Sequence, residues 1–290
     1  MIEIGSDFYL NFSSDYKFKD FYYYNKSIFF PSIRCILRRL VNKNKDSKYL
    51  LPNYLCDSIM NNFLNTDYSF FKLDNNLNID YAYLIELINR NKYDFIYIIN
   101  YFGKHDKNLN EIVKLCNEKK ITIIEDFTHN LFSENLYGNI CICSFRKILS
   151  VPFGAIMINN SNIGLDNNTP LFNYIHYFWF YFIKTFAMTL KKSKYIKFIW
   201  RPLLIYTNKN TDLLDIHNDL LSKFFFKHTY NPKIVNIRKN NYRYLHENLT
   251  NYTYINENDL YFFYILKFND KKTRDSIKKK LIKGNIYCCI

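Results

Sequence analysis

The chain has 290 residues and carries 40 lysines and arginines against 26 aspartates and glutamates, for a formal net charge of +14. A chain of this length can bury one large core, or a large lobe with a smaller companion. The excess of Lys comes with an excess of Asn, Ile, Tyr and Phe, the pattern of an AT-rich coding sequence, so the charge alone does not point to a nucleic acid or a membrane as partner.

Between residues 33 and 160 the apolar pattern switches repeatedly between the helical and the strand period, which is typical of an α/β layer fold. A helix is predicted after Ser32 as its N-cap, because Ile33, Ile36, Leu37 and Leu40 share one helical face. The pattern then predicts a strand at 49–51, a helix from about residue 53, a strand at 69–72 and a helix around 81–88.

The following stretch predicts the centre of a sheet. Residues 95–100 form an apolar run of the kind found in parallel strands that are covered on both faces. A helix around 109–116 and strands at 121–124, 140–143 and 155–158 follow. We therefore expect a mostly parallel mixed sheet of about seven strands, with helices on both faces and ligands at the carboxyl ends of the strands.

Beyond residue 160 the pattern changes to aromatic helices and polar loops. The stretch 171–190 is strongly apolar, but Asn173, His176 and Lys184 interrupt it, which is costly for a membrane-spanning helix. We expect a helix that packs a broad apolar face on protein, in preference to an amphipathic anchor on a membrane surface.

The C-terminal part of the sequence reads as a smaller lobe. A basic segment at 233–244 leads into it, and residues 284–290 resemble a strand that enters a core with nothing after it to close the sheet. We therefore expect a large domain over residues 1–225 and a small, incomplete α/β domain over residues 226–290.

The seven cysteines are odd in number and lack the paired spacing of metal ligands, so we expect reduced thiols and no metal site. Residues 1–20 carry polar and acidic positions throughout, without the apolar run of an export signal. Both observations favour a cytoplasmic protein.

The most informative residue is Lys147, which follows the strand at 140–143 and stands behind Ser144. Upstream, Glu125 and Asp126 close a neighbouring apolar strand. An enzyme that uses pyridoxal phosphate (PLP) needs a lysine to hold the aldehyde and an aspartate to keep the ring nitrogen protonated. We interpret the chain as such an enzyme, because the two residue types stand at neighbouring strand ends.

Asp126 is our choice for the ring nitrogen, and Glu125 is the competitor. Adjacent strand residues point to opposite faces, so only one of the two can reach a given pocket. His129, three residues further on, can stack on the ring or bond to its phenolic oxygen. The phosphate of the cofactor needs hydrogen-bond donors that cost little free energy to present. The first backbone amides of the helix at Ser32, Ile33 and Arg34 can supply them, and Ser144 can add a hydroxyl.

Seven short motifs, taken together and in order, resemble the DegT/StrS sugar aminotransferases, PLP enzymes of fold type I. They are Glu3–Phe8, Ser32–Ile36, Leu51–Cys56, Asn100–Gly103, Glu125–His129, Ser144–Lys147 with Val151–Gly154, and Arg238–Tyr242. The resemblance covers nearly the whole chain.

The resemblance implies a Schiff-base lysine at Lys147, Asp126 on the pyridine nitrogen and His129 against the ring. Ser144 and the turn of Ser32, Ile33 and Arg34 would surround the phosphate. Tyr54, with Tyr101 as the alternative, would contact the cofactor, and Asn100 would approach its phenolic oxygen. Members of the family transfer an amino group from glutamate or glutamine to a nucleotide-linked keto sugar, and they work as homodimers with shared active sites.

The sequence also departs from the family pattern. Ile33 stands where the family commonly has glycine, so the phosphate turn is built without a residue that tolerates positive φ. Ser144 and Lys147 are closer together than is common in the family. We expect an aminotransferase of surface polysaccharide biosynthesis, with an inactive homologue that serves as a binding or scaffold subunit as the alternative. A basic binder of membranes or nucleic acids ranks last.

Overall fold

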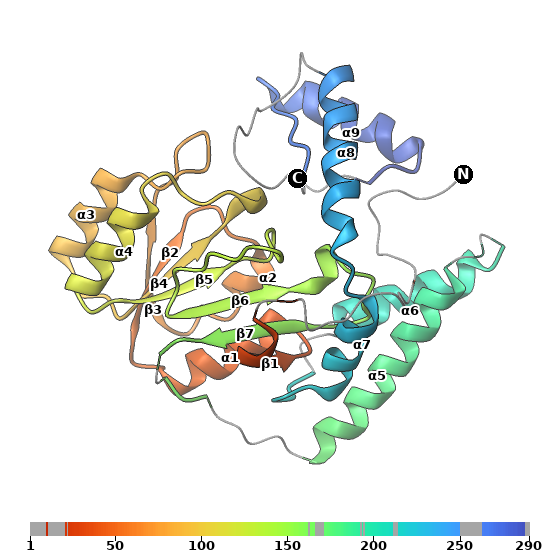
Figure 1. The fold of residues 1–290 in the computed structure, drawn as a ribbon, viewed down its shortest axis with the longest axis horizontal. Coiled ribbons are helices and arrows are strands. Elements are labelled where there is room, and N and C mark those ends of the chain that lie inside the picture. Colours follow the sequence, from red (N-terminus) through yellow and green to blue (C-terminus); the bar gives the residue numbers. More distant parts are fainter. Residues whose placement is uncertain are drawn as a thin grey trace.

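Seven strands form one mixed sheet at the centre of the molecule (Figure 1). They are β1 (Ser27–Phe30), β2 (Lys48–Pro52), β3 (Asp67–Phe71), β4 (Phe95–Ile99), β5 (Thr122–Asp126), β6 (Ile140–Ser144) and β7 (Ala155–Asn159). Their order is β1-β7-β6-β5-β4-β2-β3. Strand β7 runs antiparallel to both of its neighbours, β1 and β6, and the other pairs of the described sheet are parallel. The predicted mostly parallel sheet is confirmed.

The structure is a computed structural model that describes residues 10, 21, 23–161, 163–165, 171–191, 193, 195–210, 214–249 and 263–287. Its helices are α1 (Ile33–Lys43), α2 (Asp57–Met60), α3 (Tyr81–Arg90), α4 (Leu109–Glu118), α5 (Leu171–Leu190), α6 (Lys197–Lys209), α7 (Leu220–Thr229), α8 (Lys233–Asn248) and α9 (Lys271–Lys283). The 3₁₀ turns are η2 (Tyr24–Lys26), η3 (Tyr101–Gly103) and η4 (Phe145–Lys147).

Helices cover both faces of the sheet, as expected. On one face, α1 and α2 pack on a cluster that includes Tyr97, Ile124 and Ile142. On the other face, α3 and α4 cover the parallel strands, and α5, α6 and α7 cover the β6, β7 and β1 side. The alternation of side chains along a strand explains how one continuous apolar run serves two cores.

The register of the strands brings distant segments to one edge of the sheet. Ser144 at the end of β6 lies opposite Ala155, and Ala155 lies opposite Phe30 at the end of β1. Since α1 begins just after β1, its amino end lies at the same edge as the turn that carries Lys147. The end of β5 joins them there, because Asp126 pairs with Ile142 of β6.

Helix α1 begins where the sequence predicts. The Ser32 hydroxyl accepts a hydrogen bond from the backbone N–H of Cys35 at 3.2 Å, which satisfies one donor of the first turn. Ile33, Ile36, Leu37 and Leu40 are all buried against the sheet. Helix α2 is shorter than expected and begins at Asp57, not near residue 53.

The boundary expected at residue 225 falls inside α7. Phe225 and Phe226 belong to the same apolar cluster as Phe29 of β1, so α7 is part of the sheet domain. Beyond it, α8 projects away from the sheet and packs near α9 (Figure 1). We propose that the small lobe begins after Tyr230. Of the strand expected at 284–290, residues 284 and 285 form a turn after α9, and residues 288–290 lie outside the described residues.

Helix α5 has apolar residues on two opposite sides. Tyr177, Phe180 and Tyr181 are buried in the core, whereas Phe178, Trp179 and others on the far side are exposed. The expectation of a helix packed by an apolar face is therefore met on one side only. Within the described residues, no helix is long and apolar enough to span a lipid bilayer.

Candidate active site

Glu125 and Asp126 end β5 and serve two opposite faces of the sheet. The Glu125 carboxylate accepts hydrogen bonds from the Asn100 side-chain amide (2.8 Å) and from the backbone N–H groups of Tyr137 (2.6 Å) and Gly138 (2.7 Å). It is buried. Gly138 allows this approach, because a Cβ there would lie 2.7 Å from the Cβ of Glu125. Glu125 therefore holds the loop at Tyr137 and Gly138 in place, and its oxygens are used within the protein.

Asp126 lies on the face of Tyr97 and Ile124. Its Oδ2 accepts a hydrogen bond from the Tyr97 hydroxyl at 2.7 Å, and its Oδ1 accepts one from the backbone N–H of Thr128 at 2.9 Å. Each carboxylate oxygen can accept a second bond. Burial, then the charge of Asp126, raise the pKa of the Tyr97 phenol, which therefore stays a donor. These two bonds orient Asp126 and leave it able to accept a ligand's proton donor.

Lys147 ends the turn η4, directly after β6. Its Nζ lies 2.8 Å from Nε2 of His129, which follows β5. The two strand ends are tied together a second time, since the backbone N–H of Ser144 donates to the Thr128 hydroxyl at 3.1 Å. Lys147 and Asp126 therefore stand on two sides of one short polar segment, residues 126–129.

The protonation of His129 follows from its contacts. Burial, then the nearby charge of Lys147, lower the pKa of His129 to about 3, so the ring is neutral at physiological pH. Its Nδ1 accepts the backbone N–H of Phe102 at 3.0 Å, which assigns the ring proton to Nε2. Nε2 is the ring atom that faces the Lys147 amine, so the imidazole fixes the position of Nζ at the strand end.

Cys143, the residue before Ser144, lies close enough to Asp126 and to Lys147 for the charge of each to affect its thiol. Burial raises the pKa of its thiol, the charge of Asp126 raises it further, and the charge of Lys147 lowers it. The carboxylate and the amine therefore lie near the same point of the sheet edge.

The residues predicted to hold a phosphate meet at this edge as well. Ser32 caps α1, and the amides of Ile33 and Arg34 belong to its first turn, where an α-helix has no internal acceptor. The Ser144 hydroxyl makes no hydrogen bond within the described part of the chain. Helix amides and a hydroxyl of this kind fit an anionic group.

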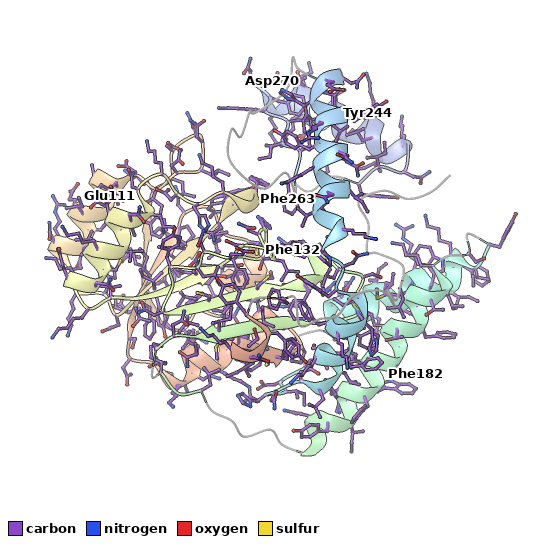
Figure 2. All side chains as sticks on the ribbon, in the orientation of Figure 1. Glu111, Phe132, Phe182, Tyr244, Phe263 and Asp270 are labelled. Atoms are coloured by element: carbon purple, nitrogen blue, oxygen red, sulfur yellow. The ribbon has the colours of Figure 1, made fainter. Side chains whose placement is uncertain are left out.

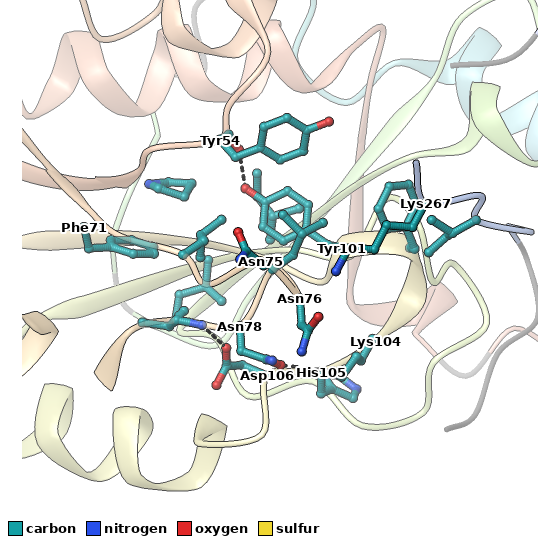
Figure 3. Close-up of a pocket in the computed structure, with 18 of the residues that line it drawn as sticks. Tyr54, Phe71, Asn75, Asn76, Asn78, Tyr101, Lys104, His105, Asp106 and Lys267 are labelled. Carbon is teal, nitrogen blue, oxygen red and sulfur yellow. Dashed lines mark hydrogen bonds between the residues drawn. The ribbon is translucent and has the colours of Figure 1, made fainter. Parts of the chain in front are cut away.

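Tyr54 and Tyr101 lie against each other, with ring centroids 5.6 Å apart. The Tyr101 hydroxyl donates a hydrogen bond to the Tyr54 carbonyl. Both line a cavity of about 450 Å³ (Figure 3). Its wall also includes the asparagines Asn75, Asn76 and Asn78 and the cations Lys104, Lys267 and Arg274. Burial, then the charge of Asp126, raise the pKa of the Tyr101 phenol. Phe102, which stacks on His129, also lines the cavity, whereas Asp126 and Lys147 are not among its described lining residues.

Asn100 does not lie where the sequence predicts. Its amide donates to Glu125, on the face away from Asp126, and its Oδ1 has no hydrogen-bond partner within the described residues. The alternation of side chains accounts for this, because Asn100 follows β4 two residues after Ile98, the partner of Glu125. The same alternation, applied to the sequence alone, places Asn100 on the side of Glu125.

Three further residues shape the site and were not predicted. Tyr97 anchors Asp126, and its signal is a hydroxyl in an otherwise apolar strand, which needs a partner when buried. Phe102 adopts a φ of 56° and stacks on His129 with centroids 5.7 Å apart, a strained backbone held at a functional position. Phe263, from the small lobe, lies 4.8 Å from the His129 ring. Phe102 lies within the Asn100–Gly103 motif but was not given a role there, and no short motif marks Phe263.

No family model and no curated protein sequence matches the chain. Solved structures do. A DegT DnrJ EryC1 StrS aminotransferase from Brucella abortus is 12% identical, with 90% of this chain and 69% of that chain covered and a TM-score of 0.54. Helicobacter pylori PseC, an aminotransferase of pseudoaminic acid biosynthesis, is 14% identical, with 89% and 70% covered and a TM-score of 0.55.

The histidinol-phosphate aminotransferase from Clostridium acetobutylicum matches in the same way, at 14% identity, 90% and 73% coverage and a TM-score of 0.52. The chain thus has the fold of the PLP-dependent aminotransferases, as predicted. Identities this low show the fold alone, and enzymes with different substrates share it.

Proposed function

We propose that this protein is a PLP-dependent aminotransferase of the DegT/StrS type, with Lys147 as the residue that binds the cofactor aldehyde. The observation that carries the proposal is the contact of 2.8 Å between Lys147 Nζ and His129 Nε2, beside Asp126 at the neighbouring strand end. Lys147 is exposed, so a ligand can reach its amine, and the half-buried imidazole of His129 fixes the position of that amine.

The residues at the sheet edge fit PLP at each of its polar ends. Asp126 would accept from the ring nitrogen, the first turn of α1 at Ser32, Ile33 and Arg34 with Ser144 would hold the phosphate, and His129 would lie against the ring. Tyr54 and Tyr101 would close the cavity side. Asn100 drops out of this set because its amide is engaged with Glu125.

When bound, PLP supplies an electron sink for the carbon that loses a proton. The chain's own contribution is proton handling. Lys147 Nζ, once freed by the amino donor, moves a proton between two carbon atoms. His129 Nε2 orients that amine, and Asp126 holds the proton of the pyridine nitrogen. Phe102 and Phe263 pack against the His129 ring and limit its exposure.

The cavity lined by Tyr54 and Tyr101 suits a polar and anionic substrate. Three asparagines offer hydrogen bonds to hydroxyl groups, and Lys104 and Lys267 offer positive charge, whereas Arg274 is paired with Asp275 and Asp106 adds one carboxylate to the wall. Glutamate or glutamine as donor and a nucleotide-linked keto sugar as acceptor, in surface polysaccharide biosynthesis, agree with this chemistry. We include a homodimer in the proposal, on the resemblance of the sequence to enzymes with shared sites.

Absorbance of the purified protein with added PLP tests the proposal. We expect a visible imine band that glutamate removes, and a covalent product after borohydride reduction that maps to Lys147. Lys147→Ala should lose both signals, whereas Lys104→Ala, a lysine of the cavity wall, should keep them. Trapping that survives in Lys147→Ala would move the reactive lysine elsewhere. Failure of the wild-type protein to take up PLP would favour the inactive homologue.

A further inference from the structure

The α5–α6 hairpin, residues 171–210, differs in charge from the rest of the chain. It contains no aspartate or glutamate, and it carries seven lysines and arginines: Lys184, Lys191, Lys192, Lys194, Lys197, Arg201 and Lys209. Half of the formal net charge of +14 therefore resides in this segment. A uniform coding bias does not produce such a concentration.

The outer side of α5 carries an aromatic stripe that the described structure leaves exposed. The stripe consists of Ile175, Phe178, Trp179, Phe182 and Phe186. Trp179, Phe182 and Phe186 stack on one another, with centroids 6.0 and 6.3 Å apart. Figure 2 shows Phe182 at the outer edge of the molecule, pointing away from the sheet. Exposed apolar surface of this kind marks an interaction site.

The tip of the hairpin and α6 add cations beside further apolar groups. Lys191 and Lys197 both approach the ring of the buried Trp200, at 5.7 and 6.0 Å. Tyr195 and Phe198, next to them, are among the most exposed aromatic residues described. A hollow on α6 is lined by Lys197, Phe198, Arg201, Pro202, Ile205, Tyr206 and Lys209.

We propose that the α5–α6 hairpin docks the protein on the surface of an anionic phospholipid bilayer. The aromatic stripe and the tip would enter the interfacial region, where Trp, Tyr and Phe rings are favoured. The exposed cations Arg201 and Lys209 of α6, with no carboxylate in the hairpin sequence, would lie at the level of the negative headgroups, whereas Lys184 is buried. The hairpin lies on the bilayer and does not cross it, in keeping with the lack of a spanning helix among the described residues.

A second copy of the chain is the less favourable occupant. A stable dimer buries about 800 Å² on each partner, and a stripe of five side chains on one helix falls short of that. A larger contact would have to include the tip and α6, and in a two-fold dimer the same cations would face one another. A bilayer surface requires no such repulsion.

The docking surface on the α5–α6 hairpin would also lie close to the candidate active site. Asn208 Oδ1 on α6 accepts from Lys184 of α5 at 2.5 Å and from Arg146, the neighbour of Lys147, at 2.9 Å. The hairpin and the reactive turn therefore share one hydrogen-bonded link. This is the arrangement expected of an enzyme that works on a substrate near a membrane.

Flotation of the full-length protein with vesicles tests this inference. We expect binding to vesicles of phosphatidylcholine with phosphatidylglycerol, little binding to phosphatidylcholine alone, and release by salt. Arg201→Glu/Lys209→Glu and Trp179→Ser/Phe182→Ser should each weaken binding by about tenfold or more. The matched controls Lys279→Glu/Lys280→Glu on α9 and Tyr244→Ser on α8, all exposed, should bind like the wild type.

Tryptophan fluorescence gives a second readout that does not depend on activity. The chain has only two tryptophans, and Trp179 is 57% exposed whereas Trp200 is 5% exposed. A blue shift with anionic vesicles would therefore report entry of Trp179 into the bilayer. Equal binding by the hairpin variants, or no binding by the wild type, would overturn the proposal. A wild-type dimer that Trp179→Ser/Phe182→Ser dissociates would assign the stripe to a second copy instead.

Discussion

The two carboxylates at the end of β5 are neighbours in sequence and opposites in their surroundings. Glu125 receives hydrogen bonds from two side chains, the Asn100 amide and the Cys141 thiol, and from two backbone amides of its own protein. Asp126 receives two, both on its inner side, and shares the sheet edge with Lys147, the Ser144 hydroxyl and the start of α1. The comparison teaches that a saturated carboxylate holds a fold together, whereas an oriented and incompletely saturated one is available for a ligand.

The largest effect is expected from Asp126→Asn. The amide keeps the shape but no longer holds a proton on the pyridine nitrogen, so transamination should fall by about 10²- to 10⁴-fold. Steady-state rates with glutamate, measured at saturating PLP, check this. Glu125→Gln should retain most of the activity. An Asp126→Asn variant as active as the wild type would reverse the assignment of the two carboxylates.

Glu125→Ala should act on stability. It removes the acceptor for Asn100 and leaves the amides of Tyr137 and Gly138 buried without a partner, so the free energy of unfolding should fall by about 3 kcal/mol. Denaturant unfolding measures it.

Glu125→Gln is the matched control for that loss. Its carbonyl oxygen can keep the two loop amides, and its NH₂ group can bond to the unpartnered Oδ1 of Asn100 if that side chain turns over. The loss should therefore be clearly smaller than for Glu125→Ala. Equal losses for the two variants would show that side-chain volume, and not the hydrogen bonds, is what this face requires.

His129 should make the stability of the folded protein depend on pH. His129 has a pKa of about 3 in the folded protein, below its ordinary value of 6.5. The unfolded chain takes up a proton below pH 6.5 and the folded chain does not, so stability should rise with pH from about 3 to 6.5 and be level above that range.

Relative to His129→Gln, we expect the wild type to lose about 1 to 2 kcal/mol more between about pH 7 and pH 5, a value reduced for partial solvent exposure. Unfolding curves at both pH values measure this. Lys147→Met should keep most of the dependence, because burial is the larger cause of the shift. A flat difference between wild type and His129→Gln would show that the imidazole is solvated.

Tyr97→Phe should have the smallest effect. It removes one of the two bonds that orient Asp126, which should cost about 1 to 2 kcal/mol of stability and a modest part of the activity. Tyr49→Phe, which removes a hydroxyl bond to the neutral carbonyl of Asn44 on the same face, is the control for stability alone. If the two variants lose activity equally, the Tyr97 bond does not position Asp126.

Much of the architecture could be read from local pattern. The apolar run of β4, the capped start of α1 at Ser32 and the strand ends at Asp126 and Ser144 are short-range signals, because burial on two faces and N-capping select residue types within a few positions. The same signals place Lys147 and Asp126 at strand ends. They do not reveal β1, whose four residues form a strand through pairing with β7.

The residues of the sequence by themselves determined the α/β class, the position of the lysine and the pair of carboxylates. Tertiary structure alone decided which partners each carboxylate has, that Asn100 turns toward Glu125, that Phe263 packs against His129, and that one side of α5 stays exposed. The physical reason is the distance along the chain over which each effect acts. Periodicity and capping act over one or two turns of chain, whereas hydrogen-bond partners and burial depend on segments that only the folded sheet brings together.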